Sequence, residues 1–216
     1  MKIMHECRHK ESGCFELGRC LLGDMTIERM IDVLNNGGTM VFPTDTLYAL
    51  GADPYNSEAV EKVFHLKNRS FEDPVSIAVS DVGMLKELAV VNEHAQRIVE
   101  RFLPGPVTLV MEAKEPFPKG IIKNGKLGIR IPRHPLPLQL VKRFGPIICT
   151  SANLTGQNAP MDAVEVVDQL GEGMDVLIDC GRSHHGVPSS VIDVSTDELI
   201  IIREGVLRSE DLLQFW

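Results

Sequence analysis

The chain has 216 residues and a formal net charge of −8, with 44% hydrophobic and 24% charged residues. This balance is that of a folded globular protein and excludes a disordered, collagen-like or coiled-coil chain. The acidic charge argues against a surface that binds nucleic acid all over, although a local basic pocket remains compatible with it. No apolar run reaches the roughly 20 residues that a membrane-spanning helix needs. Residues 1–11 are too charged for a signal peptide, so we expect a cytoplasmic protein without a membrane partner.

Residues 1–23 form a polar leader of unknown role, which we separate from one domain at 24–216. Three of the five cysteines lie in this leader, and the odd number and irregular spacing of the cysteines argue against a disulfide framework. The His and Cys spacings in the leader also differ from the CxxC pairs of zinc sites. The residues of any metal site are therefore unknown from the sequence.

The regular pattern begins at Thr26, a suitable helix N-cap, and Gly37-Gly38 is suited to end the helix that follows. Apolar residues at helical spacing predict the further helices at 57–67, 92–102, 136–144 and 162–170. Short apolar runs predict the strands at 39–42, 75–79, 107–111, 127–131, 147–150, 176–179, 190–194 and 199–202.

Alternating strands and helices predict an α/β fold, with a twisted sheet and flanking helices. The last strands are not separated by helices long enough for parallel crossovers. We therefore expect a mixed parallel and antiparallel sheet.

One motif is misleading. Residues 120–126 match the GxxxxGK pattern of a P-loop, but Leu127 stands where a Ser or Thr would hold Mg²⁺. The preceding residues 115–118 are not an apolar strand, and no long helix follows. We therefore do not expect a P-loop here. The GxSxG, HExxH and GxGxxG motifs are absent from the sequence.

Polar and cationic residues lie at the ends of several predicted elements, where open α/β sheets bind ligands. Arg130 and Arg203 each end an apolar strand, and a charge there is costly unless it meets an anion. Taken alone, Lys67 and Arg69 could complement the negative end of their helix, and the hydroxyl and amide groups could form turns. Together these groups predict a site for a polyphosphate and a carboxylate. The set is Thr46, Lys67, Arg69, Arg130, Ser151, Asn153, Ser189 and Arg203.

Several motifs, in order and spacing, resemble a known family. They are PTDTLYALG (43–51), KNR (67–69), PGPVTLV (104–110), GIRIPRHP (128–135), SANLTG (151–156) and SSVIDVS (189–195). From about Thr26 to Leu207 the chain is similar to the YrdC/Sua5 family of threonylcarbamoyl-adenylate synthases. Its KxR and SxN motifs are both intact, whereas the related YciO-like proteins generally lack them.

The resemblance implies a YrdC-like catalytic domain at 24–216 with a large, positively lined concave cavity. It implies a nucleotidyltransferase that converts L-threonine, bicarbonate and ATP to threonylcarbamoyl-AMP and pyrophosphate, with Mg²⁺ expected. The product would serve N6-threonylcarbamoyladenosine (t6A) formation at position 37 of tRNA, which makes tRNA or the t6A transferase machinery the implied partner. Chains of this length resemble the catalytic domain without the additional C-terminal domain of longer members.

The resemblance also assigns residues by position. The threonine-site residues are Thr46, Arg130, Ser151 and Ser189, and the ATP-site residues are Lys67, Arg69, Asp73, Asn153 and Arg203. The KxR and SxN residues, expected to be catalytic, are Lys67, Arg69, Ser151 and Asn153.

The chain departs from the family pattern at three positions. Many members have His where this chain has Ala78, Asn where it has Asp73 and Thr where it has Lys126. Two other functions are kept as alternatives: a non-catalytic RNA-binding module of the same fold, and carbamoyl transfer to another amine.

Overall fold

The structure is a computed structural model, which describes residues 2–4, 24–183 and 186–216. The helices are α2 (Asp24–Asn35), α3 (Ser57–Lys67), α4 (Val82–Leu88), α5 (Glu93–Phe102), α6 (Pro135–Phe144), α7 (Ala163–Leu170) and α8 (Ser209–Leu213), with a 3-10 turn η1 (Gly171–Gly173). The strands are β1 (Lys2–Met4), β2 (Met40–Pro43), β3 (Tyr48–Gly51), β4 (Ile77–Ala78), β5 (Val107–Glu112), β6 (Ile122–Lys123), β7 (Lys126–Arg130), β8 (Ile147–Ile148), β9 (Thr150–Ser151), β10 (Val176–Ile178), β11 (Ser190–Asp193) and β12 (Ile200–Arg203). Among the described residues, none of the helices combines the length and apolar character that crossing a bilayer requires.

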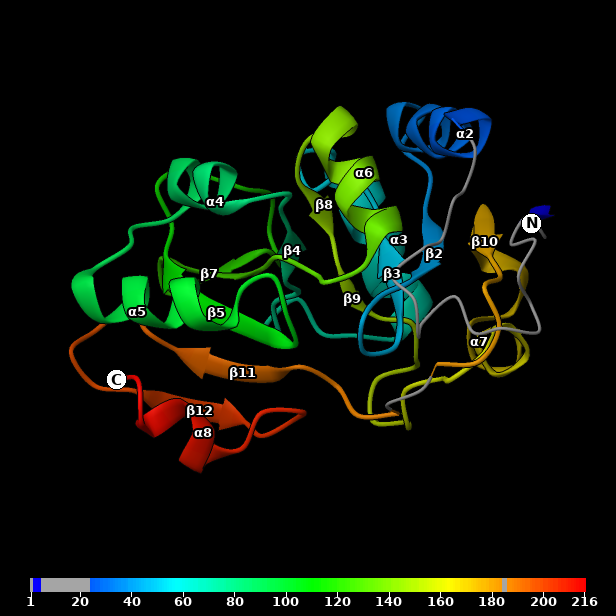
Figure 1. The fold of residues 1–216 in the computed structure, drawn as a ribbon. Helices are drawn as coiled ribbons and strands as arrows, with labels where there is room; N and C mark the ends of the chain where they lie inside the picture. The colour runs from blue at the N-terminus through cyan, green and yellow to red at the C-terminus, as the bar shows by residue number, and fades with distance from the viewer. Residues whose placement is uncertain (1, 5–23, 184–185) are drawn as a thin grey trace.

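The mixed α/β class is confirmed, but the strands form two sheets, whereas we expected one. The first sheet has the order β1-β10-β2-β3-β9, and the second β12-β11-β5-β7-β4-β8, with β6 paired to β7. Figure 1 shows the first sheet on the right and the second on the left. The predicted strand 147–150 divides at Cys149, because β8 pairs with β4 of the second sheet and β9 pairs with β3 of the first.

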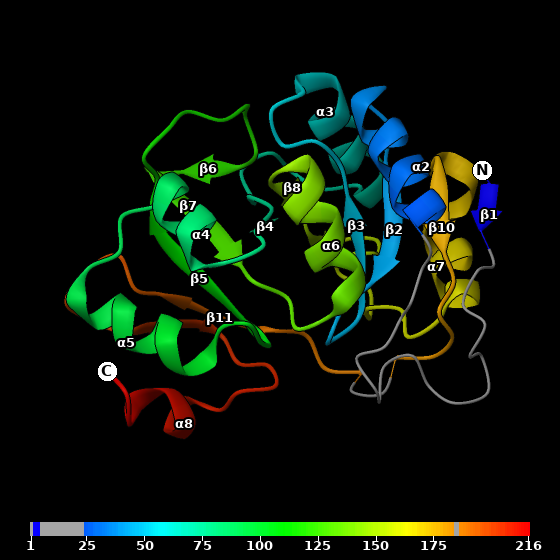
Figure 2. The same ribbon diagram turned by 45° about the horizontal axis from the view of Figure 1, so that its top comes forward.

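The first sheet is covered by helices on both faces. In β2, Met40 and Phe42 pack with residues of α2 and α6, whereas Val41 packs in the cluster that contains residues of α3 and α7. All three side chains are fully buried. Burying a side chain of this kind contributes about 1.5–3 kcal/mol, so the period-two alternation of β2 fixes which helices lie on each side. Figure 2 shows α2 and α6 on the same side of this sheet.

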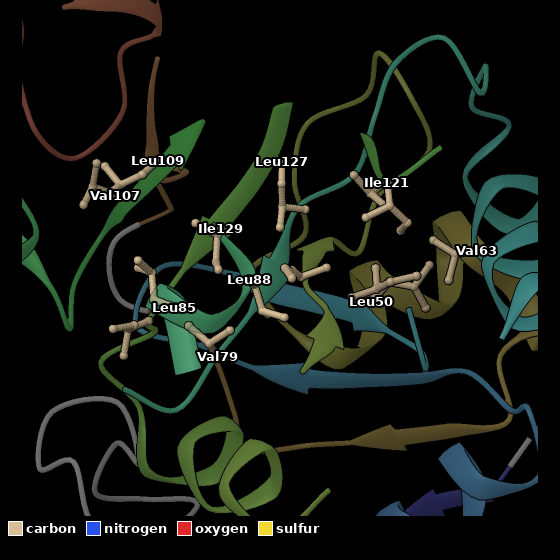
Figure 3. Packing of buried hydrophobic residues seen from close by; sticks show 14 of the residues in the cluster. Leu50, Val63, Val79, Leu85, Leu88, Val107, Leu109, Ile121, Leu127 and Ile129 are labelled. Atoms are coloured by element: carbon tan, nitrogen blue, oxygen red, sulfur yellow. The ribbon is translucent and has the colours of Figure 1, made fainter. Parts of the chain in front are cut away.

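The second sheet has one apolar face. Leu109 of β5 and Leu127 and Ile129 of β7 belong to one buried cluster with Leu85 and Leu88 of α4. Figure 3 shows these side chains gathered between the strands and the helix. Since adjacent side chains of a strand point to opposite faces, the intervening residues of β5 and β7 are directed away from this core.

The ends of the helices follow from capping residues. The side chains of Asn92 and Asp162 accept hydrogen bonds from backbone N–H groups of α5 and α7. The N–H groups of Gly37 and Gly38 close the end of α2, which confirms the predicted stop. The prediction that Thr26 caps α2 is wrong, because the helix begins at Asp24 and the buried Thr26 lies inside it.

Several elements differ from the sequence prediction. Neither helix α4 nor strand β3, which lies within the motif at 43–51, was predicted. The last strands do not form one group: β10 runs parallel to β2 in the first sheet, whereas β11 and β12 form an antiparallel pair in the second. The start of the predicted leader, β1, pairs with β10, and residues 5–23 lie outside the described part of the chain.

The segment 120–126 forms a hairpin. Strand β6 pairs antiparallel with β7, and Asn124 and Gly125 adopt positive φ angles of 53° and 74° in the turn between them. A P-loop would wrap a helix N-terminus, and this hairpin has none, so the expectation that the motif is not a P-loop is confirmed. Gly120 at its base has a φ of 97°, and an added Cβ would lie 2.5 Å from the Phe64 ring.

We expect Gly120→Ala to destabilise the protein more than Gly125→Ala. Both glycines have positive φ, so each alanine costs about 1–2 kcal/mol of backbone strain. Only Gly120→Ala also meets the ring of the buried Phe64, whereas a Cβ at Gly125 meets no atom within 4 Å. Overpacking of this kind adds about 1–3 kcal/mol. Urea unfolding of both variants measures the difference, and equal losses would contradict the packing argument.

Candidate active site

A cavity of about 580 Å³ lies where the two sheets meet. Its wall is built from β3, β5, β7, β9, β11, β12 and the loop after α3. The predicted site residues that line it are Thr46, Arg69, Asp73, Arg130, Ser151, Ser189 and Arg203. Lys67 and Asn153 do not line it and instead contact the loop of Ser151 from behind. The structure therefore brings most of the scattered candidates into one site.

The floor of the cavity is the second face of the second sheet. Thr108 and Val110 of β5 and Gly128 and Arg130 of β7 line the cavity, while the residues between them are in the core. The same alternation places Ser189, just before β11, on the cavity side, where its hydroxyl lies 3.0 Å from that of Thr108. Thr108 is not among the predicted site residues, although the alternation of residues 107–111 was the available signal.

Arg130 is held by a carboxylate that sequence analysis missed. Its Nη2 donates to Asp45 Oδ1 at 2.7 Å, and the two side chains are only 6% and 11% exposed. The Nη1 atom lies 3.5 Å from Thr46 Oγ1, and Nε has no partner among the described residues. Asp45 therefore balances the charge of Arg130 at the cavity wall. The position of Asp45 beside Thr46 in the motif 43–51 was the available signal.

A tight turn before β3 positions Thr46. The Thr44 hydroxyl donates to the Leu47 carbonyl at 2.8 Å and accepts from the Thr46 amide at 3.2 Å. The Thr46 carbonyl in turn accepts from the Ser183 hydroxyl at 2.6 Å. The Thr46 hydroxyl also lies 3.1 Å from that of Thr44, so the turn holds both the backbone and the side chain of Thr46 in the cavity wall.

Lys67 organises the loop that carries Ser151. The residue is only 1% exposed, and its ammonium donates to the carbonyls of Ser151 and Asn153, the latter at 2.8 Å. Asn153 Oδ1 accepts from the Ser151 hydroxyl at 2.5 Å, and its Nδ2 donates to the carbonyls of Leu154 and Gln157. The polar groups of Lys67 and Asn153 are thus engaged within the loop, which places Ser151 in the wall.

Two further guanidinium groups meet at the cavity. Arg69 donates from Nε to the Asp73 carbonyl at 2.7 Å, and Arg203 donates from Nη2 to the Ser189 carbonyl at 2.8 Å. Partial burial lowers the pKa of Arg203, and the positive charges of Arg130 and Arg69 lower it further. Three like charges this close repel one another, and a polyanion between them would relieve the repulsion.

At one end of the floor, Lys126 forms an ion pair with Asp193, with Nζ 2.7 Å from Oδ2. Burial raises the pKa of Asp193, but hydrogen bonds from Lys126 and Ser195 outweigh it and hold the pKa below its usual value. In the sequence Lys126 stands out only as a departure from the family pattern, and Asp193 is not among the predicted site residues. The alternation of β7 and β11 would have placed both on the cavity face. The third departure, Ala78, does not line the cavity and is buried among residues of the first sheet, α2 and α6.

The described residues contain no group of three or more His, Cys, Asp or Glu side chains that could hold a metal ion. Mg²⁺ bound to a nucleotide needs less, because phosphates and water supply most of its ligands and one or two carboxylates suffice. Asp73 and Asp193, both on the cavity wall, are of the right type. The residues present therefore fit Mg²⁺ that arrives with a triphosphate.

We expect the stability contributed by Lys67 to depend on pH. Burial, and to a lesser extent the charge of Arg69, lowers its pKa from 10.5 to about 7. Between these values the unfolded chain holds a proton that folded Lys67 lacks, so raising the pH stabilises the folded form. The free energy of unfolding of the natural protein should rise relative to that of Lys67→Met by at most about 1.4 kcal/mol per pH unit. Urea unfolding at several pH values measures this, with the exposed Lys142→Met as control; parallel profiles for the natural protein and Lys67→Met would contradict it.

The chain is similar to a known protein family along most of its length. Residues 32–205 match the family model Sua5/YciO/YrdC, which carries the description "Telomere recombination". Threonylcarbamoyl-AMP synthase of Bacillus subtilis is 32% identical over 193 residues, covering 88% of this chain and 56% of that protein. The synthase of Serratia proteamaculans is 33% identical over 183 residues, covering 82% of this chain and 94% of that protein. The chain thus spans about half the length of the first relative and nearly all of the second.

Two solved structures are similar along most of the chain. Pyrococcus abyssi Sua5 complexed with L-threonine superposes with a TM-score of 0.88 at 28% identity, covering 100% of this chain and 61% of that one. Escherichia coli YciO superposes with a TM-score of 0.81 at 26% identity, covering 88% of this chain and 94% of that one. A family model that matches most of the sequence and two related structures with the same fold together show that this chain belongs to the Sua5/YciO/YrdC family.

Proposed function

We propose that this chain is an L-threonylcarbamoyladenylate synthase, a nucleotidyltransferase that converts L-threonine, bicarbonate and ATP to threonylcarbamoyl-AMP and pyrophosphate. One observation carries the proposal: three arginines, Arg69, Arg130 and Arg203, converge on one cavity that also presents hydroxyl groups. Guanidinium groups are suited to carboxylates and phosphates, and both occur in these substrates. The product serves t6A formation at position 37 of tRNA, so the partners are tRNA or the t6A transferase machinery.

The two ends of strand β7 mark the two halves of the proposed site. Arg130 ends β7 and Lys126 begins it, and both line the cavity. Four residues of extended strand span about 13 Å. We place threonine at the Arg130 end, with its carboxylate on the guanidinium and its polar groups near Thr46 and Ser189. The nucleotide then lies toward Arg69 and Arg203, with its outer phosphates at the Lys126 end.

The chemistry needs no nucleophile from the protein. The threonine amine and bicarbonate give a carbamate and water. A carbamate oxygen then bonds to the α-phosphorus of ATP. At the same time the bond between the α-phosphorus and the oxygen bridging it to the β-phosphate breaks, and pyrophosphate leaves. Arg69 and Arg203 neutralise the phosphate charge that develops, and Arg130 keeps the amino acid in line. Mg²⁺ bound to the phosphates would supply further charge neutralisation. Ser151, placed by Lys67 and Asn153, offers a hydroxyl between the two halves.

The first test is pyrophosphate release by the purified chain with threonine, bicarbonate and ATP, omitting each in turn. We expect release to require all three, with threonylcarbamoyl-AMP as product. Arg69→Ala should lower kcat/KM about tenfold to a hundredfold, because one charge-assisted contact contributes roughly 1.5–3 kcal/mol. Arg143→Ala, an exposed arginine of α6, is the matched control. Full activity of Arg69→Ala would refute its role, and RNA binding without threonine-dependent release would favour the RNA-binding alternative.

A second test separates the two halves of the site. Arg130→Lys keeps the charge but loses the planar fork that binds a carboxylate. We expect it to raise KM for threonine about tenfold, in the range of one charge-assisted contact, with a smaller change in KM for ATP. Arg69→Lys should show the reverse pattern. Equal effects of Arg130→Lys on both substrates would contradict the assignment, and a better reaction with another amine than with threonine would favour carbamoyl transfer to that amine.

A further inference from the structure

We propose that Lys126 and Asp193 form an exchangeable ion pair that binds and releases the pyrophosphate end of the triphosphate. The inference rests on the proposed function. When ATP binds, the Lys126 ammonium leaves Asp193 and contacts the outer phosphates. It returns to Asp193 when pyrophosphate departs. Asp193 thus competes with the phosphates and limits how tightly they are held.

The two residues lie on the cavity floor on either side of β5. Asp193 of β11 stands opposite Val110, and Lys126 of β7 stands opposite Glu112, two residues further along β5. Positions two apart share a face, so both side chains project into the cavity, whose lining includes both. Their pair is therefore a part of the binding surface and not a brace on the outside of the sheet.

The partners of the pair differ in how firmly they are fixed. Asp193 Oδ1 accepts from the Ser195 amide at 2.9 Å and from its hydroxyl at 2.6 Å, while Oδ2 accepts from Lys126. The Asp193 side chain is 10% exposed, whereas that of Lys126 is 33% exposed and ends a flexible four-carbon stem. If one partner moves, it is the lysine, and the carboxylate keeps its Ser195 contacts after the lysine leaves.

The charges around the cavity favour movement of Lys126 toward a bound triphosphate. Asp45 offsets Arg130 and Asp193 offsets Lys126, whereas Arg69 and Arg203 have backbone carbonyls as hydrogen-bond partners. Two guanidinium charges do not balance a triphosphate, so its outer phosphates need a further cation. Lys126 is at the far end of the floor from Arg130, where the proposed orientation places these phosphates. The exchange is reversible because the negative charge of Asp193 attracts Lys126 back once the phosphates leave.

The test measures binding of inorganic pyrophosphate, inorganic triphosphate and AMP by calorimetry with Mg²⁺. We expect Asp193→Asn to bind the two inorganic anions about tenfold more tightly and AMP within twofold of the natural protein, because only the outer phosphates reach Lys126. Lys126→Met should weaken the inorganic anions about tenfold, and Lys126→Arg should restore most of that loss. Glu28→Gln is the matched control, since it removes one carboxylate charge from an ion pair with Arg143 outside the cavity, in which the Glu28 side chain is 55% exposed.

The outcomes distinguish an exchangeable ion pair from a purely structural pair and from a direct Mg²⁺ ligand. If Lys126→Met binds pyrophosphate as tightly as the natural protein, the pair is structural and the proposal is overturned. If folded Asp193→Asn binds the anions more weakly, Asp193 acts as a direct Mg²⁺ ligand and the competition is overturned. Should Asp193→Asn not fold, the comparison of Lys126→Met with Lys126→Arg still decides the role of the lysine. If the natural protein does not release pyrophosphate in the presence of threonine, the proposed function is wrong. The binding measurements still test the ion pair, because they do not depend on turnover.

Discussion

The alternation of side chains along β5, β7 and β11 is the constraint on which the site depends. Each strand gives its apolar residues to the core with α4 and its intervening residues to the cavity. The core therefore fixes the cavity: Leu127 and Ile129 cannot be buried without turning Lys126, Gly128 and Arg130 to the opposite face. The stability of the second sheet and the placement of the charged residues are consequences of one pattern.

The cations of the site have two types of partner. Arg130 and Lys126 each pair with a largely buried carboxylate, whereas Lys67, Arg69 and Arg203 donate to backbone carbonyls. A buried cation without a partner would be costly. The cations also differ in role. Lys67 holds the loop that places Ser151 in the cavity wall, and Asp45 holds Arg130 in place. The charges of Arg69 and Arg203 remain available to bind an anion.

Much of the fold and the site could be predicted from the sequence, because strand-end polar residues and family motifs are local signals. Helical spacing gave α3 its observed bounds, and the strand-end rule found Arg130 and Arg203. The division into two sheets was not predictable in this way, because it depends on pairing between β9 and β3, which are far apart in the chain. For the same reason Asp45 and Asp193 were missed: their importance lies in cations that only folding brings near them.

The passage of the chain from one sheet to the other at Cys149 has a consequence for how the sequence can vary. Strand β8 is registered on β4 and strand β9 on β3, with Cys149 as the single residue between them. Cys149, Thr150 and Ser151 all line the cavity, and insertion or deletion of one residue there would turn the Ser151 side chain to the other face of β9. The spacing from Ile148 to Ser151 is thus as restrictive as the residue types themselves. Length variation among related chains should be confined to segments outside this crossing.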